Sequence, residues 1–132
     1  MALNKKYIFA AGLDVFEKPV NGRNYVCCVD VARGVNKDYS AFLVFDVTQM
    51  PYKVVAKYRS NEIKPVVFPN IINEICRKYN MAYVLVETND LGQQVADALQ
   101  FECEYDNMLM CTQKGRSCLL YTSDAADEED SV

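Results

Sequence analysis

The segment Tyr25-Val26-Cys27-Cys28-Val29-Asp30 is a run of apolar, β-prone residues that ends in an aspartate. The segment Ala82-Tyr83-Val84-Leu85-Val86-Glu87 repeats this pattern and ends in a glutamate. Continuous apolar runs of this length are typical of strands that are covered on both faces of a sheet. Because a buried, unpaired carboxylate is very costly, two acids at the matching ends of two such strands predict a divalent cation between them. The cation would be magnesium or manganese, held by oxygen ligands. The alternative is that each acid only ends its strand in a solvated loop.

The neighbouring segments predict a mixed α/β sheet. Residues 25–31 and 40–47 are apolar strands joined by a loop short enough for an antiparallel hairpin. Residues 52–59 alternate, as an edge strand with one solvated face does. Its two predicted faces are Tyr52, Val54, Ala56 and Tyr58 on one side and Lys53, Lys57 and Arg59 on the other.

The pattern then becomes helical. Val67, Ile71, Ile75 and Tyr79 recur every four residues and predict an amphipathic helix. This helix would cross over to the strand at residues 82–87, which a helical crossover makes parallel to the strand it joins. A second helix after Asp90 and a short strand at residues 108–111 complete the order. A meander followed by a helical crossover is the plan of the ribonuclease H-like fold, in which the first strand lies beside the fourth and would bring Asp30 next to Glu87.

Length and composition predict one folded domain. The chain has 132 residues, half of them hydrophobic, and a formal charge of −4. Five acids and no base lie in residues 118–132, which leaves 13 acids against 14 bases in the rest, so the low pI does not argue against a nucleic-acid partner. Six cysteines without C-x-x-C spacing and the absence of histidine argue against zinc. They indicate a reducing, intracellular compartment, and no apolar run is long enough to span a membrane.

Two motifs carry a family resemblance. Val29-Asp30-Val31-Ala32-Arg33-Gly34 with Asp38-Tyr39-Ser40, and Val84-Leu85-Val86-Glu87-Thr88-Asn89-Asp90-Leu91-Gly92, together resemble the nuclease domain of the large terminase subunit of tailed bacteriophages. The resemblance covers about residues 12–116. It implies a ribonuclease H-like domain in which Asp30 and Glu87 match two of three acids that hold two Mg²⁺ or Mn²⁺ ions. It also implies endonucleolytic cleavage of double-stranded DNA concatemers during genome packaging in the host cytoplasm, with the phage portal and the small terminase subunit as partners.

The resemblance leaves several residues with two interpretations. Asp38 is either an auxiliary acid near the metal ions or a turn residue that bonds to backbone N–H groups. Four bases either contact DNA phosphates or are ordinary solvated residues: Arg33, Lys37, Lys114 and Arg116.

The chain also departs from the family pattern. It contains no G-x-x-x-x-G-K-[ST] loop, so we expect no ATP hydrolysis. The third metal-binding acid lies, in the family, beyond the part that matches, so we expect a domain that is incomplete at its C-terminus and inactive in DNA cleavage. We divide the chain into an amino-terminal arm or linker (1–21), a partial nuclease domain (22–117) and a disordered acidic tail (118–132). The tail resembles a translated adapter of sequencing libraries and is interpreted as foreign; a natural acidic tail is the alternative.

Two other functions fit the same residues. The domain could be a non-catalytic α/β interaction module whose acids are structural. It could also belong to another ribonuclease H-like nuclease, of the resolvase or transposase type.

Overall fold

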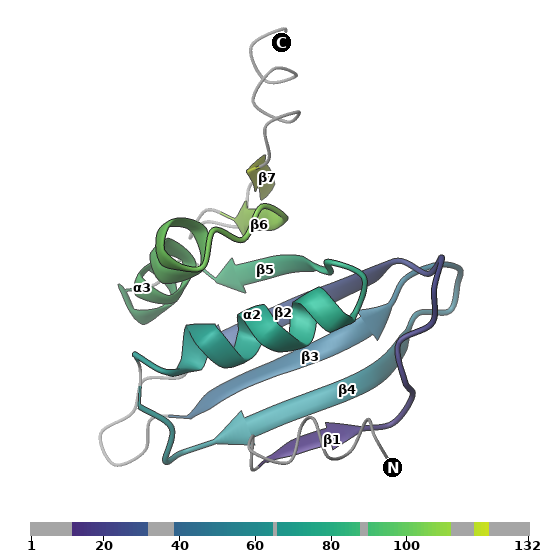
Figure 1. Cartoon of the computed structure of the whole chain (residues 1–132), viewed down its shortest axis with the longest axis horizontal. Coiled ribbons are helices and arrows are strands. Elements are labelled where there is room, and N and C mark those ends of the chain that lie inside the picture. The colour runs from purple at the N-terminus through teal and green to yellow at the C-terminus, as the bar shows by residue number, and fades with distance from the viewer. Residues whose placement is uncertain (1–11, 32–38, 65, 88–89, 112–117, 122–132) are drawn as a thin grey trace, which may run out of the picture.

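The computed structural model describes residues 12–31, 39–64, 66–87, 90–111 and 118–121. Four strands come first, and helices and further strands follow them (Figure 1). They are β1 (Leu13–Val15), β2 (Tyr25–Val31), β3 (Ser40–Asp46), β4 (Lys53–Ser60), α2 (Phe68–Lys78), β5 (Tyr83–Glu87), α3 (Asp90–Asp97), the π-helical η1 (Ala98–Glu102), β6 (Met108–Cys111) and β7 (Cys118–Tyr121).

The strands form one mixed sheet in the order β1-β4-β3-β2-β5-β6-β7. β2, β3 and β4 are an antiparallel meander. β5 returns beside β2 and is parallel to it, and β6 is parallel to β5. The predicted order of elements and the pairing of the first long strand with the strand after the crossover helix are therefore confirmed.

Helix α2 buries the stripe that the sequence predicted. Its inward residues include Ile71, Ile72, Ile75 and Cys76, all buried, because residues three and four apart lie on the same side of a helix. Pro69 lies in the first turn, where its missing N–H removes no helical hydrogen bond. Val67, which we expected in the stripe, is the N-cap and is 38% exposed.

The core lies on one face of the sheet only. The side chains that alternate toward α2 and α3 along β2 are Tyr25, Cys27 and Val29, and all are buried in one cluster with residues of both helices. The rings of Phe42 and Tyr58 stack at 5.2 Å between centroids within this cluster. On the opposite face, which we call the open face, the side chains of the same strand are half-buried (Val26 and Cys28) or exposed (Asp30). Our expectation that these strands are covered on both faces is therefore wrong for the described residues.

Two further expectations about the sheet are corrected. β4 is not an edge strand, because β1 pairs with its other side from Leu13 to Val15. Its alternation is also interrupted: the register shifts between Val44 and Phe45, and Val55 is buried while Val54 is 38% exposed. A bulge inserts one residue in one strand and so reverses which face the following side chains occupy.

Strands also occur at both ends of the sheet where the sequence predicted an arm and a disordered tail. β1 lies within the predicted arm, and β7 lies within the predicted tail, where it pairs antiparallel with β6. Residues 122–132 lie outside the described part. No helix among the described residues is long and apolar enough to cross a membrane.

Candidate metal centre

Asp30 and Glu87 occupy equivalent positions on neighbouring parallel strands. The register between β2 and β5 runs from Val26 opposite Tyr83 to Val29 opposite Val86. Asp30 and Glu87 are the next residue on each strand, and neighbouring strands lie about 4.8 Å apart. Because side chains alternate between faces, both acids point away from the buried Val29 and Val86 and onto the open face.

Both carboxylates are exposed. The expected burial of these acids is therefore wrong: both are hydrated, and no desolvation cost demands a counter-ion. Neither acid forms a hydrogen bond or ion pair with any described residue. Two neighbouring carboxylates without partners among the described residues can instead offer oxygen ligands to a cation that arrives from solvent.

The donor set fits a hard divalent cation. Mg²⁺ is usually held by one or two carboxylates together with water and substrate phosphates, which two exposed acids on a rigid sheet can provide. Cys28 lies two residues before Asp30 on the same face, but burial raises the pKa of its thiol, so it stays protonated near neutral pH and is a poor ligand. No group of three or more His, Cys, Asp or Glu residues in the described part of the chain could hold a metal ion.

A shallow hollow of about 260 Å³ adjoins Asp30 on the open face. Lys57 and Arg59 of β4 line the side of this hollow opposite Asp30, because β3 lies between β2 and β4. The alternation along their strand predicted a solvated position for these two bases and no functional role. Only the register across three strands brings them near Asp30.

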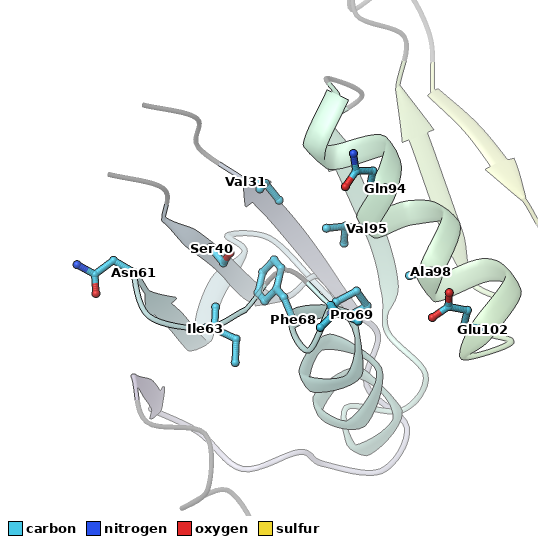
Figure 2. Close-up of a pocket in the computed structure, with 11 residues that line it drawn as sticks. Val31, Ser40, Asn61, Ile63, Phe68, Pro69, Gln94, Val95, Ala98 and Glu102 are labelled. Carbon is cyan, nitrogen blue, oxygen red and sulfur yellow. The ribbon is translucent and has the colours of Figure 1, made fainter. Parts of the chain in front are cut away.

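A larger cleft of about 500 Å³ lies on the helix-covered face, between α2 and α3 (Figure 2). Its lining is mainly apolar and includes Phe68, Pro69 and Val95. Among the described residues that line it, Glu102 is the only ionisable one. Val31, whose side chain lines the cleft, follows Asp30 in β2 and points to the opposite face. The described lining of the cleft therefore offers no convergent metal ligands, and it does not include either of the two acids.

Comparison with known proteins identifies the family. Residues 27–118 match the family described as the terminase RNaseH-like domain. The chain belongs to this family. The match contains all of β5 and β2 from Cys27 onward, and therefore both acids of the candidate metal centre.

Solved structures of phage terminase nucleases have the same fold. The large terminase nuclease from thermophilic phage G20c with bound magnesium superposes with a TM-score of 0.62 at 21% identity, and the alignment covers 92% of this chain and 57% of that one. The same nuclease with bound zinc gives a TM-score of 0.62 at 20% identity, with 89% and 61% covered. The nuclease domain of Thermus phage P74-26 large terminase gives 0.59 at 21% identity, with 89% and 54% covered. The terminase domain described here thus spans little more than half the length of these structures.

The other site residues expected for a terminase nuclease fall outside the described part of the chain. Asp38, Arg33 and Lys37 lie in residues 32–38, and Lys114 and Arg116 lie in residues 112–117. Their expected roles as an auxiliary acid and as DNA contacts remain predictions.

Proposed function

We propose that Asp30 and Glu87 hold divalent metal ions, Mg²⁺ or Mn²⁺, for endonucleolytic cleavage of double-stranded DNA. The observation that carries the proposal is the parallel register that sets the two acids side by side on the open face. Membership in the terminase RNaseH-like family supports it, as does the bound magnesium of the phage G20c nuclease.

The residues of this chain supply the ligands and their rigidity. Both acids follow buried positions in paired strands, which restricts their backbone and lowers the cost of orienting the carboxylates. Their exposure leaves room for a phosphate of the substrate beside the ligands. When bound, the metal would activate a water molecule and stabilise the charge that develops on the phosphate oxygens.

We further propose that the parent protein cuts DNA concatemers during genome packaging in the host cytoplasm, with the portal and the small terminase subunit as partners. In the chain as given, two acids should bind metal weakly, with a dissociation constant of about a millimolar, because the number of charged ligands sets affinity. Little or no cleavage is expected from it. A third acid from further sequence would complete the site for two ions.

Paramagnetic Mn²⁺ provides the test, because it broadens NMR signals of nearby nuclei. Titration into the isotope-labelled chain should broaden the amide signals around Asp30 and Glu87 first. The variant Asp30→Asn/Glu87→Gln should lose this selective broadening. The matched control Glu62→Gln/Glu74→Gln removes the same charge from two exposed acids away from the open face and should behave as wild type.

Equal broadening in the double-acid variant would refute the proposed roles. It would favour the alternative that the acids are structural parts of a non-catalytic interaction module.

A further inference from the structure

We propose that Lys57 and Arg59 of β4 each contact a phosphate of the DNA strand that passes over the two acids. The inference rests on the proposed function and adds the face of the sheet on which the substrate lies. Its basis is the arrangement of charge on the open face, where two bases lie across one strand from Asp30.

The register places an acid and a base in one row across the sheet. Ala41 of β3 lies opposite Asp30 on one side and opposite Arg59 on the other. Two strand spacings separate Arg59 from Asp30, which is about 10 Å. Phosphates of one DNA strand follow each other at about 3.4 Å along the duplex axis. Arg59 would therefore meet a phosphate within about three nucleotides of the one at the acids.

The hollow between the acid and the bases provides space for that phosphate. Ala41, with its single methyl group, and Cys28 form part of the lining, and Asp30, Lys57 and Arg59 lie around them. A larger side chain at residue 41 would fill the hollow. The small residue thus keeps open the path from the bases to the acids.

Both bases are available for a phosphate. The guanidinium carbon of Arg59 lies 4.2 Å from the centroid of the Tyr39 ring, a cation–π contact that orients the planar group. Its guanidinium N–H groups donate to no residue in the described part of the chain. Lys57 is exposed and forms no hydrogen bond or ion pair with any residue that the structure describes, although Asp14 lies opposite it in β1.

Two other bases near this sheet are paired with carboxylates. The Nζ atom of Lys53, in the same strand, lies 3.0 Å from a carboxylate oxygen of Glu17. The guanidinium of Arg23 lies 2.9 Å from Asp46. Lys57 and Arg59 are therefore the bases of β4 whose charge no described carboxylate compensates, and they share the face of Asp30.

The test is DNA binding by the full chain in the presence of a metal chelator, measured by fluorescence anisotropy of a labelled short duplex. The variant Lys57→Gln/Arg59→Gln is compared with wild type and with the control Lys53→Gln/Lys78→Gln, which removes two positive charges outside the open face. Loss of two phosphate contacts should reduce the slope of log affinity against log salt by about 1.8. The ratio of wild-type to variant affinity should then fall about twelvefold between about 50 and 200 mM salt. The loss should be similar for duplexes of different sequence.

Three results would overturn the inference: unchanged binding by the variant, an equal loss in the control, or no measurable binding by wild type at about 50 mM salt. Failure of the inference can be distinguished from failure of the proposed function by measuring Mn²⁺ broadening around Asp30 in the Lys57→Gln/Arg59→Gln variant. Retained broadening with unchanged DNA binding refutes only the role of the two bases. Weakened DNA binding without selective broadening in wild type supports the bases and refutes the metal site.

Discussion

Replacing Asp30 by Asn should stabilise the domain when no metal is present and destabilise it relative to wild type when metal is abundant. Asp30 and Glu87 are like charges on adjacent parallel strands, without a compensating base among the described residues. Asn has nearly the same shape as Asp and removes the repulsion. It also removes one of the two proposed ligands.

The size of both effects follows from the geometry. Two unit charges about 5 Å apart repel by about 0.8 kcal/mol in a water-like dielectric, which is appropriate because both acids are exposed. This agrees with the range of about 0.2–1 kcal/mol for cross-strand pairs. For a chain of 132 residues the unfolding entropy is about 0.28 kcal/mol/K, so Tm should rise by about 3 °C. Metal at ten times its dissociation constant should stabilise wild type by about 1.4 kcal/mol, or about 5 °C.

Thermal unfolding followed by circular dichroism measures both the charge repulsion and the stabilisation by metal, first with a chelator and then with increasing Mg²⁺. In chelator, the Tm of Asp30→Asn should be about 3 °C above that of wild type. At Mg²⁺ about ten times its dissociation constant for wild type, the Tm of Asp30→Asn should be about 2 °C below that of wild type. Added monovalent salt should shrink the first difference, because it screens exposed charges. Glu74→Gln, an exposed acid on α2, is the control and should show neither effect. A lower Tm of Asp30→Asn in chelator, or equal stabilisation of both proteins by Mg²⁺, would refute this reasoning.

Three further predictions concern the scaffold. Burial alone would raise the pKa of Asp46, but hydrogen bonds from Thr48 and Arg23 lower that pKa below its ordinary value of 3.8. Urea unfolding should therefore show Asp46→Asn to be less stable than wild type by about 1–3 kcal/mol at pH 7. This difference in stability should disappear as the pH falls below about 3.8 through the folded pKa of Asp46. A difference that does not change with pH would contradict this prediction. Phe68→Ala, at a fully buried ring stacked near Tyr58, should cost about 3–5 kcal/mol in the same assay, and a loss below about 1 kcal/mol would show that the site is not tightly packed. Gly12 has φ +99°, and a Cβ there would clash with the carbonyl oxygen of Arg59. Gly12→Ala should therefore speed hydrogen exchange of the Arg59 amide, which donates to the carbonyl oxygen of Gly12. Unchanged exchange would show that the alanine is accommodated without a clash.

Much of the fold could be predicted from local patterns. The apolar run at residues 25–31 matches β2 in both bounds, and the four-residue period predicted the buried side of α2. These patterns are readable because side-chain direction repeats every two residues in a strand and every 3.6 in a helix. The order of a meander followed by a helical crossover also matched the ribonuclease H-like plan, in which the first strand lies beside the fourth, and so predicted that Asp30 and Glu87 lie close together. Their role as metal ligands remains a prediction.

Other features were decided by tertiary structure alone. An apolar run does not show how many faces of a strand are covered, and here the described helices cover one, which leaves Asp30 and Glu87 exposed. The shifted register at Val44 and the pairing of β1 with β4 depend on which strands meet, and β4 became an interior strand as a result.

The sequence by itself determined the strands, the crossover helix and the acids at matching strand ends, because each depends on the order of residues within one segment. Only the tertiary structure decided that Arg59 shares a row with Asp30 through Ala41. The physical reason is that the register between strands results from long-range hydrogen bonding and packing, and a shift of one residue would move every side chain of the strand to the other face.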